Sequence, residues 1–276
     1  MREITLREMQ QIELELLAAL DDVCAQHGLR YYIDGGTLLG AVCYDGFIPW
    51  DDDIDIKMPR PDYEKLLSLQ EAFPAHIVLD PPRPGHCEYT FLKLIDRRTV
   101  LEERLGDSVK TTGVYIDVLP MDGHPADPKT RAAHFAAMSR LNGLFHASLI
   151  KFAAMKTSPR LTVRVKGFIY SILYSPWKLC EKQKKRALKY PYDKAQQVGL
   201  LVEGDPVRES FPKAWLEPPM MMEFEGRRFP APNEAEKHLS IFYRKPISRE
   251  LYYQKLPKIP SSHNHRVYWK EEPCQD

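Results

Sequence analysis

The pattern of apolar and polar positions predicts a long amphipathic helix near the start of the chain. Between Ile4 and Gly28, apolar residues recur close to 3.6-residue spacing, at Leu6, Met9, Leu16, Leu20 and Val23. Gly28 is a typical helix stop, because glycine readily adopts the left-handed conformation that ends many helices. A second helix is expected to begin at Pro61, since proline is well tolerated in a first turn.

Short apolar runs bounded by turn residues predict several strands. We expect them at Tyr31–Asp34, Ile77–Leu79, Tyr89–Ile95, Val100–Glu102 and Val114–Leu119. A short helix is expected at Thr37–Val42, and the pattern becomes helical again after Pro128, to about Ala154. No internal repeat or low-complexity tract interrupts this succession.

An acidic run, Asp51-Asp52-Asp53-Ile54-Asp55-Ile56, follows the first glycine-rich stretch. If the run is a strand, Asp53 and Asp55 project together, while Ile54 and Ile56 point the other way into the core. Two carboxylates roughly 6 Å apart repel each other by about 3 kcal/mol at an effective dielectric near 20. We therefore interpret the run as oxygen ligands for Mg²⁺ or Mn²⁺. A solvated acidic loop is the alternative.

A pair of glycines, Gly35-Gly36, precedes this run at a predicted strand-to-helix junction. Glycine lets the backbone approach a ligand closely, and the N–H groups of a helix start attract anions. The alternative is a plain turn. Together with the acidic run, the glycines predict a phosphate cradle beside a metal site, as phosphoryl or nucleotidyl transfer requires.

Two segments carry longer motifs: Tyr32–Val42 reads Y-I-D-G-G-T-L-L-G-A-V, and Gly46–Ile56 reads G-F-I-P-W-D-D-D-I-D-I. They strongly resemble the LicD family, the bacterial phosphorylcholine transferases related to fukutin-type proteins. Later landmarks of the family correspond to Phe91–Asp96, Tyr115–Gly123, Glu223–Gly226 and Pro232. The chain departs from the family at Cys43, where Arg is usual, and at Tyr243-Arg244, where Tyr-Gly is common.

The resemblance implies an α+β fold of the nucleotidyltransferase-like, polymerase-beta type, with a mixed sheet, flanking helices and a helical basic insert. We expect one domain over residues 1–276. Its core would cover about 20–125, a helical basic accessory region about 128–190, and a C-terminal region that completes the domain about 195–260.

The resemblance also implies a reaction. Phosphorylcholine would move from CDP-choline to a sugar hydroxyl of a cell-surface glycan precursor, of the teichoic acid or lipopolysaccharide type. Another phospho-alcohol, ribitol or glycerol phosphate carried by its CDP derivative, is the alternative donor group. A nucleotide-binding protein of the same fold without turnover is the alternative outside enzymes.

Each candidate residue receives a role on this basis. Asp53, Asp55 and Asp117 would be catalytic, and Asp51 would join them as ligands of Mg²⁺ or Mn²⁺. Asp117 lies between Ile116 and Val118, so it faces away from the core, as the third metal ligand or as the base for the acceptor hydroxyl; a solvated aspartate is the alternative. The donor phosphates would contact Gly35, Gly36, Thr37 and Lys93, although Lys93 could instead be a surface lysine.

The formal net charge of +1 conceals a basic segment. Between Arg140 and Tyr190 there are twelve Lys and Arg residues and a single acid, Glu181, with apolar residues interleaved. We interpret the segment as a contact with an anionic membrane surface, with Tyr174 and Trp177 at headgroup level, which suits a lipid-linked glycan acceptor. Ordinary helical packing with a charged outer face is the alternative. No nucleic-acid partner is expected, because no recognised binding motif accompanies the charge.

Other sequence patterns bear on the localisation of the protein and on the class of enzyme. The N-terminus does not look like a secretory signal, and no apolar stretch reaches the 18 residues of a spanning helix. The five cysteines are scattered and contain no Cys-x-x-Cys, which is typical of reduced thiols. We therefore expect a cytoplasmic enzyme, peripheral at the inner face of the membrane. Gly-x-Ser-x-Gly and the Walker pattern are absent, which argues against an acyl hydrolase and a P-loop ATPase.

Overall fold

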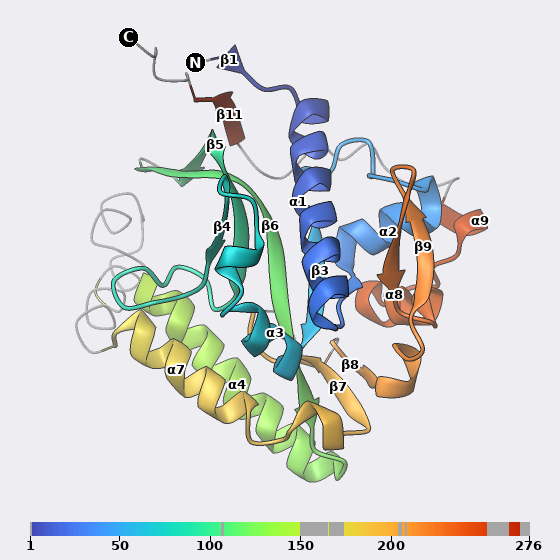
Figure 1. Ribbon diagram of the computed structural model, residues 1–276. Helices are drawn as coiled ribbons and strands as arrows, with labels where there is room; N and C mark the ends of the chain where they lie inside the picture. The colour runs from blue at the N-terminus through green and yellow to red at the C-terminus, as the bar shows by residue number, and fades with distance from the viewer. Residues whose placement is uncertain are drawn as a thin grey trace.

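A mixed nine-stranded sheet forms the frame of the described part of the chain (Figure 1). The computed structural model describes residues 2–105, 108–149, 165, 174–203, 206–207, 209–252 and 265–270. The strands are β1 (Arg2–Glu3), β2 (Tyr32–Ile33), β3 (Asp55–Pro59), β4 (Ile77–Asp80), β5 (Leu92–Leu105), β6 (Ser108–His124), β7 (Gln197–Leu200), β8 (Ser210–Pro212) and β11 (His265–Trp269). Strands β9 (Met220–Phe224) and β10 (Arg227–Ala231) pair separately as a hairpin.

The main sheet has the order β1-β11-β5-β6-β3-β2, with β4 paired to β5, β7 to β6 and β8 to β7. Within it, β3 and β6 are parallel, while the other recorded pairs are antiparallel. The helices are α1 (Leu6–His27), α2 (Gly35–Tyr44), α3 (Arg60–Leu66), α4 (Pro128–Leu149), α7 (Pro176–Ala187), α8 (Ala235–Tyr243) and α9 (Arg249–Tyr252). The expectation of an α+β fold with a mixed sheet is confirmed.

Helix α1 agrees closely with the expectation. Thr5 caps its start through a reciprocal pair of contacts: the Glu8 N–H donates to Thr5 Oγ1, and the Thr5 N–H donates to the Glu8 carboxylate at 2.9 Å. Gly28 ends the helix in the left-handed conformation, with φ +62°. The buried residues Leu16, Leu17 and Leu20 pack in one cluster with apolar side chains of the sheet, namely Ile54, Ile56, Ile116 and Val118. The apolar stripe therefore fixes α1 alongside β6 and β5 (Figure 1).

Two expected strands are in fact one. The predicted strands at Tyr89–Ile95 and Val100–Glu102 both fall on β5, whose pairing with β6 is irregular between Asp96 and Leu101. Strand β5 begins only at Leu92, because the residues before it bend away from the ladder. Tyr89 and Phe91 instead line a pocket beside β5.

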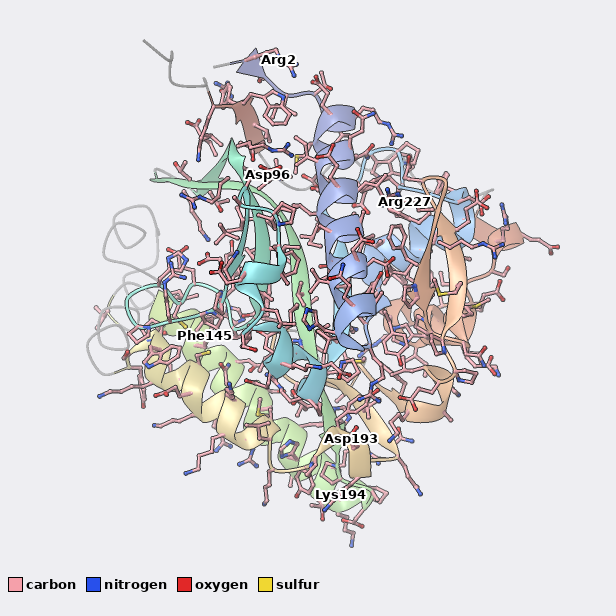
Figure 2. All side chains as sticks on the ribbon, in the orientation of Figure 1. Arg2, Asp96, Phe145, Asp193, Lys194 and Arg227 are labelled. Carbon is pink, nitrogen blue, oxygen red and sulfur yellow. The ribbon has the colours of Figure 1, made fainter. Side chains whose placement is uncertain are left out.

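The described part of the basic segment is helical and packed. Helices α4 and α7 lie side by side (Figure 1), and Phe145, labelled in Figure 2, is fully buried in a cluster with Leu179 and Cys180. Tyr174 and Trp177 pack against this same cluster. The rest of the segment, residues 150–164 and 166–173, lies outside the described residues, as does the expected helix end at Ala154. Among the described residues, no helix combines the length and apolar character needed to cross a bilayer.

Candidate active site

Three predicted residues form a row across adjacent strands. Asp55, the first residue of β3, pairs in register with Asp117 of β6, and Asp117 pairs in register with Lys93 of β5. Paired residues project from the same face of a sheet, so the three side chains are neighbours. Lys93 Nζ lies 2.6 Å from Asp117 Oδ1. Burial lowers the pKa of Lys93, while the Asp117 charge opposes that shift.

A second group of carboxylates lies in the loop before β3. Asp51, Asp52 and Asp53 each offer an oxygen within 4.8 Å of the others. The expectation that Asp53 shares a strand with Asp55 is wrong, because β3 begins at Asp55. The neighbouring β2 ends at Ile33, where the chain turns into α2, and its recorded pairing with β3 covers only Ile56 and Lys57.

The loop group and the strand pair form one electrostatic unit. Burial raises the pKa of Asp55 well above its usual range, and the charges of Asp53 and Asp117 raise it further. Ile54 and Ile56, on either side of Asp55, are fully buried in the core, while Asp55 itself is half-buried. The predicted division between a carboxylate face and a core face therefore holds around Asp55.

The glycine turn lies directly against these carboxylates. Gly35 has φ +56°, and a Cβ built there would lie 3.0 Å from Asp55 Oδ2. A Cβ at Gly36 would lie 2.6 Å from Asp51 Oδ2. The predicted Thr37 hydroxyl accepts the Asp55 N–H at 2.9 Å, so it positions the start of β3. The positive end of the α2 dipole thus adjoins both carboxylates.

A buried network supports the turn from the C-terminal part of the chain. Asp34 caps α2 by accepting the Gly35 N–H at 2.8 Å, and it contacts His238 Nε2 of α8 at 2.7 Å. Lys57 forms ion pairs with both Asp34 and Glu209. Burial alone would raise the pKa of Asp34, but the charges of His238 and Lys57 hold it well below its usual range.

Glu13 is a residue of this region that the sequence reasoning missed. Its side chain on α1 is fully buried, and neither carboxylate oxygen has a hydrogen-bond partner among the described residues. Burial raises its pKa, followed by the charges of Asp53, Asp52 and Asp51. One turn earlier, Gln10 Nε2 donates to the Asp51 carbonyl at 2.9 Å, so this face of α1 meets the acidic loop. An acid inside the apolar stripe of α1 was the available sequence signal.

This donor set fits a divalent cation. All the groups are carboxylates, the hard oxygen ligands that Mg²⁺ and Mn²⁺ prefer. A buried carboxylate without hydrogen bonds is costly, and Glu13 lies beside the Asp51–Asp53 loop, so a cation would offset both its desolvation and the mutual repulsion.

Comparisons with known proteins add independent information. Residues 28–122 match the family model described as "LicD/FKTN/FKRP, nucleotidyltransferase domain". Over 276 aligned residues the chain is 27% identical to the lipopolysaccharide cholinephosphotransferase LicD of Haemophilus influenzae, covering 97% of this chain and 98% of that protein. It is 28% identical over 111 residues to an uncharacterized protein of Rickettsia prowazekii, covering 40% of this chain and 39% of that protein. Over 103 residues it is 33% identical to mannosyltransferase regulator 4 of Saccharomyces cerevisiae, covering 33% of this chain and 8% of that protein.

Proposed function

Because the chain carries a LicD-family domain, we propose that it transfers phosphocholine to a sugar hydroxyl of a surface glycan, with CDP-choline as the donor. The observation that carries this proposal is the in-register pair of Asp55 and Asp117 beside the glycine turn, in a chain similar to a cholinephosphotransferase over nearly its whole length. We further propose that the domain has the nucleotidyltransferase-like topology and spans residues 1–276, with the subdivisions expected from the sequence.

The residues of the site have separable tasks. Asp51, Asp53, Asp55 and Asp117 would hold Mg²⁺ or Mn²⁺, with Glu13 behind the loop. The cation would supply positive charge opposite the charge that develops on the transferred phosphate. The N–H groups at the start of α2, at Gly36 and Thr37, would bind donor phosphate oxygens.

Asp117 and Lys93 would handle charge at the acceptor side. The Asp117 carboxylate can accept the proton of the sugar hydroxyl as the phosphate is attacked and CMP leaves. Lys93, 2.6 Å from Asp117, would then neutralise a phosphate oxygen. Lys93 is buried against Asp117, so the attraction between these two charges is stronger than that between an exposed lysine and a carboxylate.

We also propose a peripheral position at the inner face of the membrane. The exposed face of α7 carries Lys178, Lys182 and Lys185, while Lys184 is paired with Glu64 at 2.6 Å. Each cation near an anionic surface contributes about 1 kcal/mol. Co-sedimentation with anionic vesicles should fall when Lys178, Lys182 and Lys185 are all changed to Gln. Equal sedimentation of the two proteins would contradict the proposed membrane contact. It would not affect the transferase proposal.

The reaction is tested directly with purified protein, Mn²⁺ and a lipopolysaccharide or teichoic acid acceptor. CDP-choline, CDP-ribitol and CDP-glycerol are offered separately, and CMP release and labelled acceptor are measured. The proposal expects CDP-choline to be preferred. Preference for CDP-ribitol or CDP-glycerol would assign a polyol phosphate as the transferred group. No CMP release from any of the three donors would favour a non-catalytic protein.

A further inference from the structure

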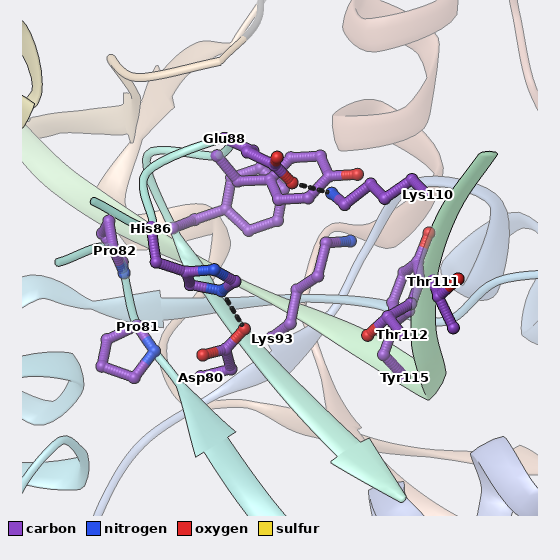
Figure 3. A pocket seen from close by; sticks show the side chains of 12 residues that line it. Asp80, Pro81, Pro82, His86, Glu88, Lys93, Lys110, Thr111, Thr112 and Tyr115 are labelled. Carbon is purple, nitrogen blue, oxygen red and sulfur yellow. Dashed lines mark hydrogen bonds and ion pairs between the residues drawn. The ribbon is translucent and has the colours of Figure 1, made fainter. Parts of the chain in front are cut away.

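An aromatic pocket adjoins the carboxylate row on the side of Lys93. Its cavity measures about 240 Å³, less than the roughly 300–1,000 Å³ of pockets that take whole drug-sized ligands. It therefore suits one chemical group rather than an entire nucleotide. Figure 3 shows Lys93 projecting from β5 into this pocket, with the Glu88–Lys110 ion pair on one side and Tyr115 on another.

Three rings surround the Lys93 ammonium. Its Nζ lies 3.4 Å from the ring centroid of Tyr115, 4.2 Å from that of Tyr89 and 5.3 Å from that of Phe91. All three distances fall within the roughly 6 Å range of cation–π attraction. The rings converge from two elements, since Tyr89 and Phe91 precede β5 while Tyr115 lies on β6. Lys110 Nζ lies 4.0 Å from the Tyr89 centroid as well, so the pocket receives positive charge from two of its own lysines.

The charges around the pocket do not oppose a second cation. Lys93 is paired with Asp117, and Lys110 is paired with Glu88, both at 2.6 Å. Asp80 adds a further carboxylate to the lining, where it forms an ion pair with Arg83 and contacts His86 at 2.7 Å. With carboxylates matching the lysines, aromatic faces dominate the recognition. Such faces suit a quaternary ammonium, which has no N–H to donate, better than a polyol, which needs hydrogen bonds.

We propose that Tyr89, Phe91 and Tyr115 form the subsite for the quaternary ammonium of the donor, and that Lys93 and this head group compete for the same rings. The inference rests on the proposed function and specifies its head group. When the head group enters, the flexible Lys93 side chain moves toward the transferred phosphate, which would lie beside Asp117. Head-group binding and charge neutralisation are thereby coupled through a single lysine.

Steady-state kinetics with CDP-choline and CDP-glycerol test the subsite. Tyr115→Leu and Tyr89→Leu should each raise KM for CDP-choline 5- to 30-fold and change KM for CDP-glycerol less than 3-fold. Tyr115→Phe keeps the ring and should keep KM for CDP-choline near the wild-type value, which separates the ring from the hydroxyl. Tyr268→Leu, on the distant β11, is the matched control, and thermal unfolding verifies that each variant is folded.

A binding measurement separates this inference from the proposed function. Tetramethylammonium is titrated into the wild type and into Lys93→Met, which removes the competing charge at similar length. Lys93→Met should bind the probe at least 5-fold more tightly, and adding Tyr115→Leu should abolish the gain. That result would support the subsite even if no donor were turned over. Turnover of CDP-choline with unchanged KM in both leucine variants, or equal probe binding by wild type and Lys93→Met, would overturn the subsite and leave the transferase standing.

Discussion

Asp55 and Asp117 lie opposite each other in register on the parallel strands β3 and β6. These two strands are distant in sequence, and their parallel pairing brings two carboxylates to the same face of the sheet beside the start of α2. The arrangement costs electrostatic free energy unless a cation is bound, as the raised pKa of Asp55 indicates, because burial and the neighbouring Asp53 and Asp117 all disfavour its ionised form.

Neutralising either member of this pair should stop turnover. We expect Asp55→Asn or Asp117→Asn to lower the rate of CMP release from CDP-choline at least 10³-fold, because the charge stabilisation given by a metal is worth several kcal/mol. Both variants should stay folded, since asparagine removes repulsion. Asp22→Asn, at an exposed position of α1, is the control and should behave as the wild type. Near-normal turnover in either site variant would remove that residue from the catalytic machinery.

Glu13 should matter for the cation and not for the fold. Glu13→Gln preserves shape and removes a buried carboxylate beside three aspartates, so the metal-free protein should melt at the same or a higher temperature. Mn²⁺ affinity should fall at least 10-fold. Calorimetric titration and thermal unfolding in EDTA measure the two effects. Unchanged affinity would make Glu13 a structural residue only.

The contribution of two buried histidines to stability should decline on mild acidification, whereas the raised pKa values of Glu13 and Asp55 act in the opposite direction. Burial lowers the pKa of His124 to about 3 and that of His134 to about 4. Both are neutral in the folded state, whereas these histidines in the unfolded chain take up protons below about pH 6.5, so their contribution to the free energy of unfolding falls as the pH decreases. His124 alone accounts for a loss of up to about 2 kcal/mol between pH 7 and pH 5.

Urea unfolding at these two pH values measures the change in the free energy of unfolding in the wild type and in His124→Gln. Glutamine cannot take up a proton, so on going from pH 7 to pH 5 the variant should lose less stability than the wild type, or gain more. An identical difference in the two proteins would mean that His124 titrates alike in the folded and unfolded states.

A stability gain is expected at the end of α8. Arg244 caps this helix in the left-handed conformation, with φ +52°. Arg244→Gly should raise the free energy of unfolding by about 0.5–1 kcal/mol, because glycine adopts this conformation without a Cβ clash. Arg244→Ala retains the clash and should give no gain. A loss on substitution by glycine would show that contacts of the Arg244 side chain outweigh the backbone strain.

Local signals in the sequence were sufficient for part of the site. The alternation around Asp55 and Asp117, and the glycines at 35 and 36, predicted residues that the fold brings together. The position of Asp53 was mistaken, because a two-residue partner strand cannot be recognised from the pattern of Asp51–Ile56.

Long-range features left no local trace. The pairing of Asp34 with His238 joins residues 204 positions apart, and the convergence of Tyr89 with Tyr115 depends on the antiparallel pairing of β5 with β6. Hydrophobic periodicity predicts on which face of its own helix or strand a side chain lies. It does not predict which distant residue that side chain contacts. For Glu13 the sequence was partly informative. Its position within an apolar stripe indicates burial, but the residues around it could not be predicted.

Binding of Mn²⁺ followed by electron paramagnetic resonance tests the central claim most directly, because it requires neither the right donor nor the right acceptor. Wild type and Asp22→Asn should bind Mn²⁺ with the same affinity. The double variant Asp55→Asn, Asp117→Asn should bind it at least 100-fold more weakly, while retaining the wild-type melting temperature in EDTA. Equal Mn²⁺ affinity in the folded double variant would contradict the assignment of this carboxylate pair as a metal site.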